Sequence, residues 1–202
     1  MRTKFVESNK PEKYIHNVRN VDSGSVSSIS TVSNSIPAGT PVILNLSATA
    51  QPTTYQNGLP AGFEDGLQVC LPVSAANNMG LDAALAVQLF HYGCAIGNIA
   101  YNALGEVMVH GVYPAALITR ATRSASTASW SSSASVAGGQ LLTVDTINNA
   151  YTTLATASAT HQLSMLPVFL LDSLASFSAS ASNSSDTRTA MITTQRVFIR
   201  EM

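Results

Sequence analysis

Charged residues are scarce in this sequence. Only 10% of its 202 residues are Asp, Glu, Lys or Arg, and the formal net charge at pH 7 is −1. An average soluble domain has roughly 25% charged residues, so much of this surface must consist of Ser, Thr, Asn, Ala and backbone groups. A net charge near zero argues against a general nucleic-acid binder, which needs a basic face. The composition suits a protein whose surface is partly covered by neighbours.

Long apolar runs are absent as well. No apolar run approaches the roughly 20 residues that a membrane-spanning helix needs. The N-terminal residues MRTKFVESNK lack the apolar segment of a secretory signal. We therefore expect a protein that is made in a cytoplasm and stays there or goes wherever its assembly goes, and that has no membrane partner.

Cysteine is limited to Cys70 and Cys94. The two residues form no CxxC motif, and both lie in apolar sequence of the kind found in strands. We interpret them as buried, reduced thiols. A structural disulfide between them is the alternative.

Motifs for metal binding and catalysis are also missing. The four histidines are scattered along the chain: His16, His91, His110 and His161. None of them forms the HxxxH or HExxH spacing that places two imidazoles on one metal ion. Glu64 and Asp65 precede Gly66, as in a solvated turn, and no GxSxG elbow, Walker-type loop or GxGxxG motif occurs. The sequence predicts no metal, no cofactor and no enzymatic activity.

Basic residues are concentrated at the N-terminus. Five of the ten lie within the first nineteen positions, and the next one is Arg120. These five are Arg2, Lys4, Lys10, Lys13 and Arg19. Apart from scattered large side chains such as Phe5, Tyr14 and Ile15, residues 1–35 are mostly polar or small. Alone they cannot bury enough apolar area to offset the entropy of ordering. We interpret residues 1–35 as an extended arm that becomes ordered on a partner; an ordinary frayed terminus is the alternative.

From Ile36 onward, short apolar stretches alternate with Gly, Pro, Ser and Asn. This pattern predicts several strands. They are expected at 42–46, 67–73, 87–99, 105–112, 163–174 and 189–202. A short turn or helix is expected at 78–84. Residues 141–162 are expected to form a strand and then a helix, with Asp145 or Thr146 as its N-cap. We predict a mainly β protein: a small β-barrel or β-sandwich at 36–202, with one or two short helices and the extended N-terminal arm.

The apolar stretch 94–117 is expected to form a hairpin, with NALGE as its turn. In the strand that follows, Val107 and Val109 face one side, while Met108 and His110 face the other. Both faces carry apolar groups. We therefore expect one face in a barrel interior and the other under a loop or a second subunit.

A low-complexity segment, SASTASWSSSASVAGG, contains the only tryptophan, Trp130. An exposed Trp130 would be able to stack on a sugar. A loop anchor tucked into the protein is the other interpretation of this residue.

Three segments of the β-rich region carry a resemblance: SIPAGTPVIL, VQLFHYGCAIGNIAYNALGEVMVHGVYP and LPVFLLD. At these segments the chain resembles tailed-bacteriophage head decoration proteins, also called capsid cement proteins. That family typically has a small β-rich domain with an early AGTPV turn and strand, a YGVA-like strand leading into a G-E-V hairpin, and a late PVFLL-like strand. The matching residues are 38–42, 92–95, 105–107 and 167–171. The arm and the Ser/Ala-rich loop at 124–139 depart from the shortest members.

The resemblance implies a non-enzymatic clamp on the outside of a viral shell. Its partner would be the major capsid protein, its location the virion, and its own state a homotrimer or another homo-oligomer. We expect the arm to bind the capsid through anchors and basic residues, namely Phe5, Tyr14, Ile15, Lys4, Lys10, Lys13 and Arg19.

Two other interpretations remain open from the sequence. One is a different virion structural protein, associated with neck, tail or fibre, that binds protein or a glycan through Trp130. The other is a small hydrolase that uses one of the many serines.

Overall fold

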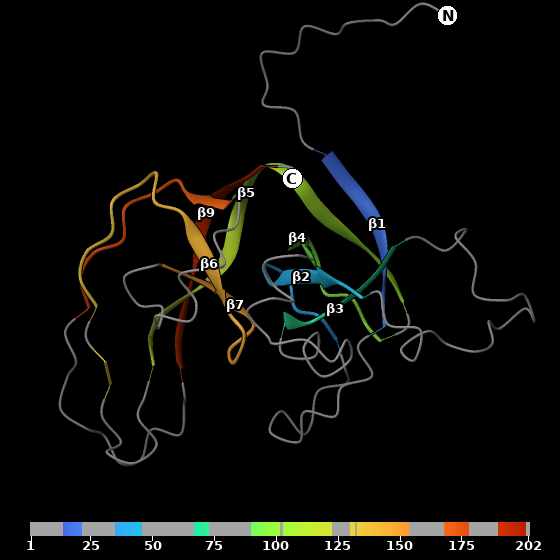
Figure 1. The fold of residues 1–202 in the computed structure, drawn as a ribbon, viewed down its shortest axis with the longest axis horizontal. Coiled ribbons are helices and arrows are strands. Elements are labelled where there is room, and N and C mark those ends of the chain that lie inside the picture. The colour runs from blue at the N-terminus through green and yellow to red at the C-terminus, as the bar shows by residue number, and fades with distance from the viewer. Residues whose placement is uncertain are drawn as a thin grey trace, which may run out of the picture.

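The computed structural model describes residues 14–21, 35–45, 67–72, 90–101, 103–122, 130–131, 133–153, 168–177 and 190–200. The elements named within these residues are nine β-strands, so the predicted mainly β class is confirmed (Figure 1). The strands are β1 Tyr14–Asn20, β2 Pro41–Leu44, β3 Leu67–Cys70, β4 His91–Ala95, β5 Leu104–Thr122, β6 Leu142–Asp145, β7 Ala150–Thr153, β8 Val168–Leu170 and β9 Ala190–Ile199.

Five strands form a closed barrel in the order β1, β3, β2, β4, β5, and β5 pairs back to β1. The β1–β3 pair is parallel, and the other four pairs are antiparallel. The β-barrel alternative of the predicted fold is therefore the correct one. The expected hairpin is present, because β4 and β5 pair at Cys94 with Met108 and at Ala95 with Val107. Its predicted turn at 102–106 is misplaced, since residues 104–106 already belong to β5 and pair with β1.

A small apolar core fills the barrel, and all five barrel strands contribute to it. Its buried members are Val18, Ile36, Val42, Val69, Ala95, Ile99, Val107 and Val109. Most of these side chains are Val or Ala, as suits a barrel of so few strands, whose interior is narrow. Ile36 and Ile99 pair through an isolated bridge beside the barrel strands.

A second sheet is built on the other half of β5, in the order β6, β7, β5, β9, β8. A bridge between Leu141, next to β6, and Phe169 of β8 brings the two ends of this sheet together. The long strand therefore belongs to both sheets: it pairs with β1 up to His110 and with β9 from Gly111 onward. The sequence predicted a strand only at 105–112. The register shift between Tyr113 and Ala116 accommodates Pro114, which cannot donate a ladder hydrogen bond.

The barrel wall separates the first core from a second, larger one. Side chains alternate across a strand, so Val42, Val69, Ala95 and Val107 face the barrel interior while their neighbours Ile43, Cys70, Cys94 and Met108 enter the second core. There they join residues of the second sheet, among them Tyr113, Tyr151, Leu170 and Val197. The predicted two-sided burial of the 105–112 strand is confirmed, and the chain's own second sheet provides the second cover. Both cysteines are buried and free, as expected.

Two expectations are corrected. Residues 14–21 were assigned to an arm, but β1 is part of the barrel, and Val18, Asn20 and Val21 are buried. The arm stays a prediction for residues 1–13 and 22–34, which lie outside the described residues, as does the short turn or helix expected at 78–84. The helix expected after Asp145 is wrong: a turn follows, and then β7.

Gly111 marks the point where β5 passes from one sheet to the other. Its φ of 110° lies in a region that L side chains rarely adopt. Before it the even-numbered Met108 faces the second core; after it the odd-numbered Tyr113 does. At Gly111, where the strand passes from one sheet to the other, the residues that face the second core thus change from even-numbered to odd-numbered positions.

Replacing Gly111 with Ala is expected to destabilise the protein by about 1 to 3 kcal/mol, because the new Cβ would strain a left-handed backbone conformation. Urea denaturation of both proteins measures this. Gly97 is a suitable control, since a Cβ built there meets nothing within 4 Å. Equal losses at the two positions would contradict a special role for Gly111.

Candidate functional site

The structure places three of the seven proposed arm residues. Tyr14 and Ile15 are each 46% exposed at the start of β1, and Arg19 lies partly buried near its end, opposite Leu104 and Gln68. These residues are held on a barrel strand. The other four predicted arm residues, Lys4, Phe5, Lys10 and Lys13, lie outside the described residues.

Tyr14 begins a continuous series of apolar and aromatic side chains on the outside of the molecule. Its ring packs edge-on against His110, with centroids 5.6 Å apart. His110 packs in the same way against Phe198 at 5.5 Å. Phe198 pairs across strands with Phe169, which pairs with Leu141. We call these five residues the aromatic row.

The row faces outward because its sequence neighbours face inward. Val197 and Ile199 flank Phe198 and are buried in the second core, as are Val168 and Leu170 on either side of Phe169. Strand alternation then directs Phe198 and Phe169 to the outside. Tyr14 is exposed, and the other four members of the row are partly exposed. No local sequence pattern reveals this row, because its members come from four strands and from the residue before β6, which are far apart in the chain.

A buried polar cluster links the barrel to the second sheet. Nε2 of His91 in β4 lies 3.1 Å from the hydroxyl oxygen of Tyr151 in β7. That hydroxyl also donates to the carbonyl of Gly93 at 3.3 Å. The Cys94 thiol lies next to the phenol and donates to the carbonyl of Ala95 at 3.9 Å.

Burial keeps this cluster uncharged. It lowers the pKa of His91 to about 4 and raises the pKa values of the Cys94 thiol and the Tyr151 phenol above their ordinary values. At neutral pH the group therefore holds a neutral imidazole, a thiol and a phenol. A thiol in this state is a poor nucleophile, and we assign the cluster a structural role.

Within the described part of the chain, no group of three or more His, Cys, Asp or Glu side chains is arranged to hold a metal ion. Nor do these residues include a helix long and apolar enough to cross a membrane.

Of the two interpretations of Trp130, the structure supports the anchor tucked into the protein and not the exposed ring, because only 7% of its surface is exposed. The segment around it is tied to β5, since the backbone N–H of Ser131 donates to the Thr122 carbonyl at 2.9 Å. Further along, Ser133 pairs with Phe177 and Val136 with Leu174. The glycan-binding interpretation thereby loses the exposed ring that it requires.

The turn between β6 and β7 shows what Asp145 does in place of starting a helix. One carboxylate oxygen accepts from the backbone N–H of Ile147 at 3.1 Å and of Asn148 at 3.2 Å. Asn149 then adopts a φ of 50°, in the left-handed region that Asn tolerates. The sequence Asp-Thr-Ile-Asn-Asn was thus a turn signal, because Asp and Asn side chains stabilise turns as readily as helix starts.

The segments that carry the resemblance to head decoration proteins fall mainly on strands. Residues 38–42 form a turn and enter β2, 92–95 lie in β4, 105–107 in β5, and 168–170 form β8. The chain matches no protein-family model, and no curated protein matches it. The functional assignment therefore depends on the residues and surfaces of this chain.

The free energy of unfolding is expected to fall by roughly 3 kcal/mol as the pH decreases from about 6.5 to about 4; this is the contribution of His91 by itself. In this range the unfolded chain binds a proton on His91 while the folded protein does not, so stability rises with pH. Urea denaturation across the range should show that His91→Gln removes this component.

Thr194→Val is the control, since it changes an exposed position on β9 and removes no titratable group. Its pH dependence should follow that of the unmodified protein. Identical pH profiles for His91→Gln and the unmodified protein would contradict the burial argument.

Proposed function

We propose that this protein is a structural component of a phage head that binds the outer surface of the capsid and bridges neighbouring major capsid subunits. The observation that supports this most directly is the aromatic row, an outward apolar surface at the point where the basic N-terminal segment joins the barrel. Because the motifs of the chain resemble those of head decoration proteins, we take a capsid to be the partner that binds this surface.

The aromatic row has properties that favour protein binding. Aromatic side chains are enriched in protein interfaces and commonly account for much of the binding energy. Tyr14, His110 and Phe198 are held by mutual ring contacts on paired strands. Little conformational entropy would be lost when a partner covers them.

The architecture also suits a clamp under load. Both sheets share β5, and the buried His91–Tyr151 contact joins them a second time. Separating the sheets would expose the larger core, which includes residues from both. A unit of this kind can hold two subunits at a fixed spacing, and bridging them makes the second contact effectively intramolecular. Modest affinity per contact is then sufficient.

The remaining parts of the proposal follow the resemblance. The protein acts as a homotrimer or another homo-oligomer in the virion and has no catalytic role. The basic residues Lys4, Lys10, Lys13 and Arg19 meet acidic capsid surface, while Phe5, Tyr14 and Ile15 provide apolar anchors. The alternative of a neck, tail or fibre protein uses the same surface with a different protein partner.

The double substitution Tyr14→Ala with Phe198→Ala is expected to weaken binding to empty phage heads by about 30-fold, the loss typical of an interface hot spot. Sedimentation of heads with increasing protein measures the affinity. Ile192→Ala is the control, because Ile192 is 41% exposed on β9 but is not part of the row.

Thermal denaturation checks that each variant is folded. Unchanged affinity of a folded double variant would exclude the aromatic row as the capsid-binding surface. Parallel assays with purified tails distinguish the alternative: binding to tails and not to heads would favour it.

Deleting residues 1–13 is expected to reduce head occupancy at limiting protein, and more so at low salt, because three lysines and Arg2 are removed. The deletion stops before Tyr14, since removing β1 would open the barrel. A charge-reversed variant with Lys4, Lys10 and Lys13 changed to Glu separates charge from apolar anchoring. Full occupancy by the deleted protein would refute the proposed arm.

A further inference from the structure

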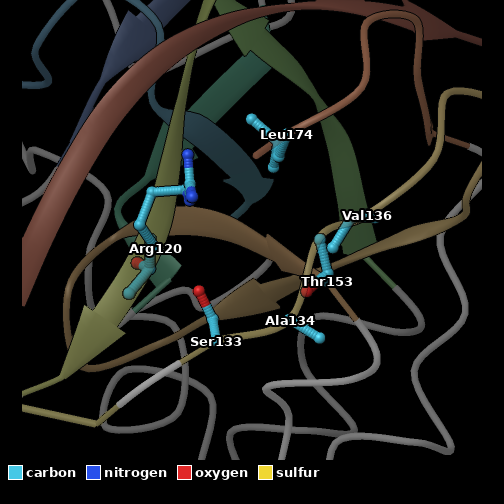
Figure 2. A pocket seen from close by; sticks show the side chains of 7 residues that line it. Arg120, Ser133, Ala134, Val136, Thr153 and Leu174 are labelled. Carbon is cyan, nitrogen blue, oxygen red and sulfur yellow. The ribbon is translucent and has the colours of Figure 1, made fainter. Parts of the chain in front are cut away.

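A small cavity lies where the Trp130 segment meets the second sheet. Figure 2 shows side chains that line it: Arg120 comes from β5 and Thr153 from β7, and Ser133, Val136 and Leu174 come from segments outside the named strands. Thr119 completes the lining from β5. The cavity is unrelated to the aromatic row and contains no residue of the buried His91 cluster.

Two hydroxyl groups at this cavity are buried and have no hydrogen-bond partner within the described chain: those of Thr119 and Ser133. Thr119 as a whole is only 4% exposed. A buried hydroxyl without a partner costs free energy that valine, which has nearly the same shape, would avoid. Each of the two hydroxyls, which belong to residues that line the same cavity, therefore calls for a polar partner.

The size and charge of the cavity define that partner. Its volume of about 10 Å³ corresponds to a single water molecule and excludes a sugar, a nucleotide or a phosphate. The guanidinium of Arg120, which donates to the carbonyl of Ala175, disfavours a metal cation. Both hydroxyls can donate and accept, as a bridging water requires.

We propose that one ordered water molecule binds in this cavity and bridges the hydroxyls of Thr119 and Ser133. It ties the Ser/Ala-rich segment to β5 through side chains, beyond the backbone contacts that Ser133 and Val136 already make. The water thereby helps to hold the segment that carries Trp130 against the second sheet.

Thr119→Val and Ser133→Ala test the proposal by the sign of their effects. If a water bridges the hydroxyls, each single substitution raises the unfolding equilibrium constant about fivefold, the typical worth of one hydrogen bond. The double variant loses less than the sum of the two, because both substitutions break the same bridge. Urea denaturation of the full chain measures all four proteins, and Thr194→Val, at an exposed position on β9, is the control.

Single substitutions that leave stability unchanged or increase it would overturn the proposal, since they would mean that the hydroxyls are unpaired in a dry cavity. A second outcome would also overturn it. If chloride stabilised the protein more than gluconate did at equal ionic strength, and Ser133→Ala abolished this difference, the occupant would be an anion bound near Arg120. A crystal structure provides the direct test: a solvent peak within about 3.2 Å of both hydroxyl oxygens is expected, and its absence would contradict the bridge.

Discussion

The pairing of β5 with strands of two sheets is the constraint on which the rest of the structure depends. Its first half closes the barrel with β1, and its second half pairs with β9 and β7. Because one backbone serves both sheets, the barrel wall becomes the partition between two cores. Gly111 permits this arrangement by changing which residues face the second core at the point of transfer.

The same constraint assembles the outer surface. β1 begins at Tyr14, opposite His110, and β9 pairs with β5 from the next residue onward, so Tyr14, His110 and Phe198 meet although they are far apart in the chain. Inside the protein, the side chains of His91, Cys94 and Tyr151 are buried and uncharged, although these residue types are often reactive. They link the two sheets. The molecule thus combines a buried, uncharged interior with an outward aromatic row, which is the surface that we propose for binding a partner.

Local sequence patterns were informative where a strand is recognised by its own residues. The alternation of Val107 and Val109 with Met108 predicted a strand buried on both faces, and the apolar runs located β2, β3, β4, β8 and β9. The patterns failed at Asp145, where helix caps and turns use the same residue types. They also failed at Tyr14–Asn20, whose polar sequence is stabilised in the barrel by pairing on both sides rather than by its own apolar content.

The sequence by itself determined the β class, the approximate positions of most strands, the buried free cysteines and the low charge, because these depend on composition and on the two-residue period of a strand. Only the tertiary structure decided that β1 closes the barrel, that Trp130 is buried, and that the aromatic row exists. Each of these depends on which distant segments pair. The packing of the whole chain sets which segments pair, and the local periodicity of a segment carries no information about its distant partner.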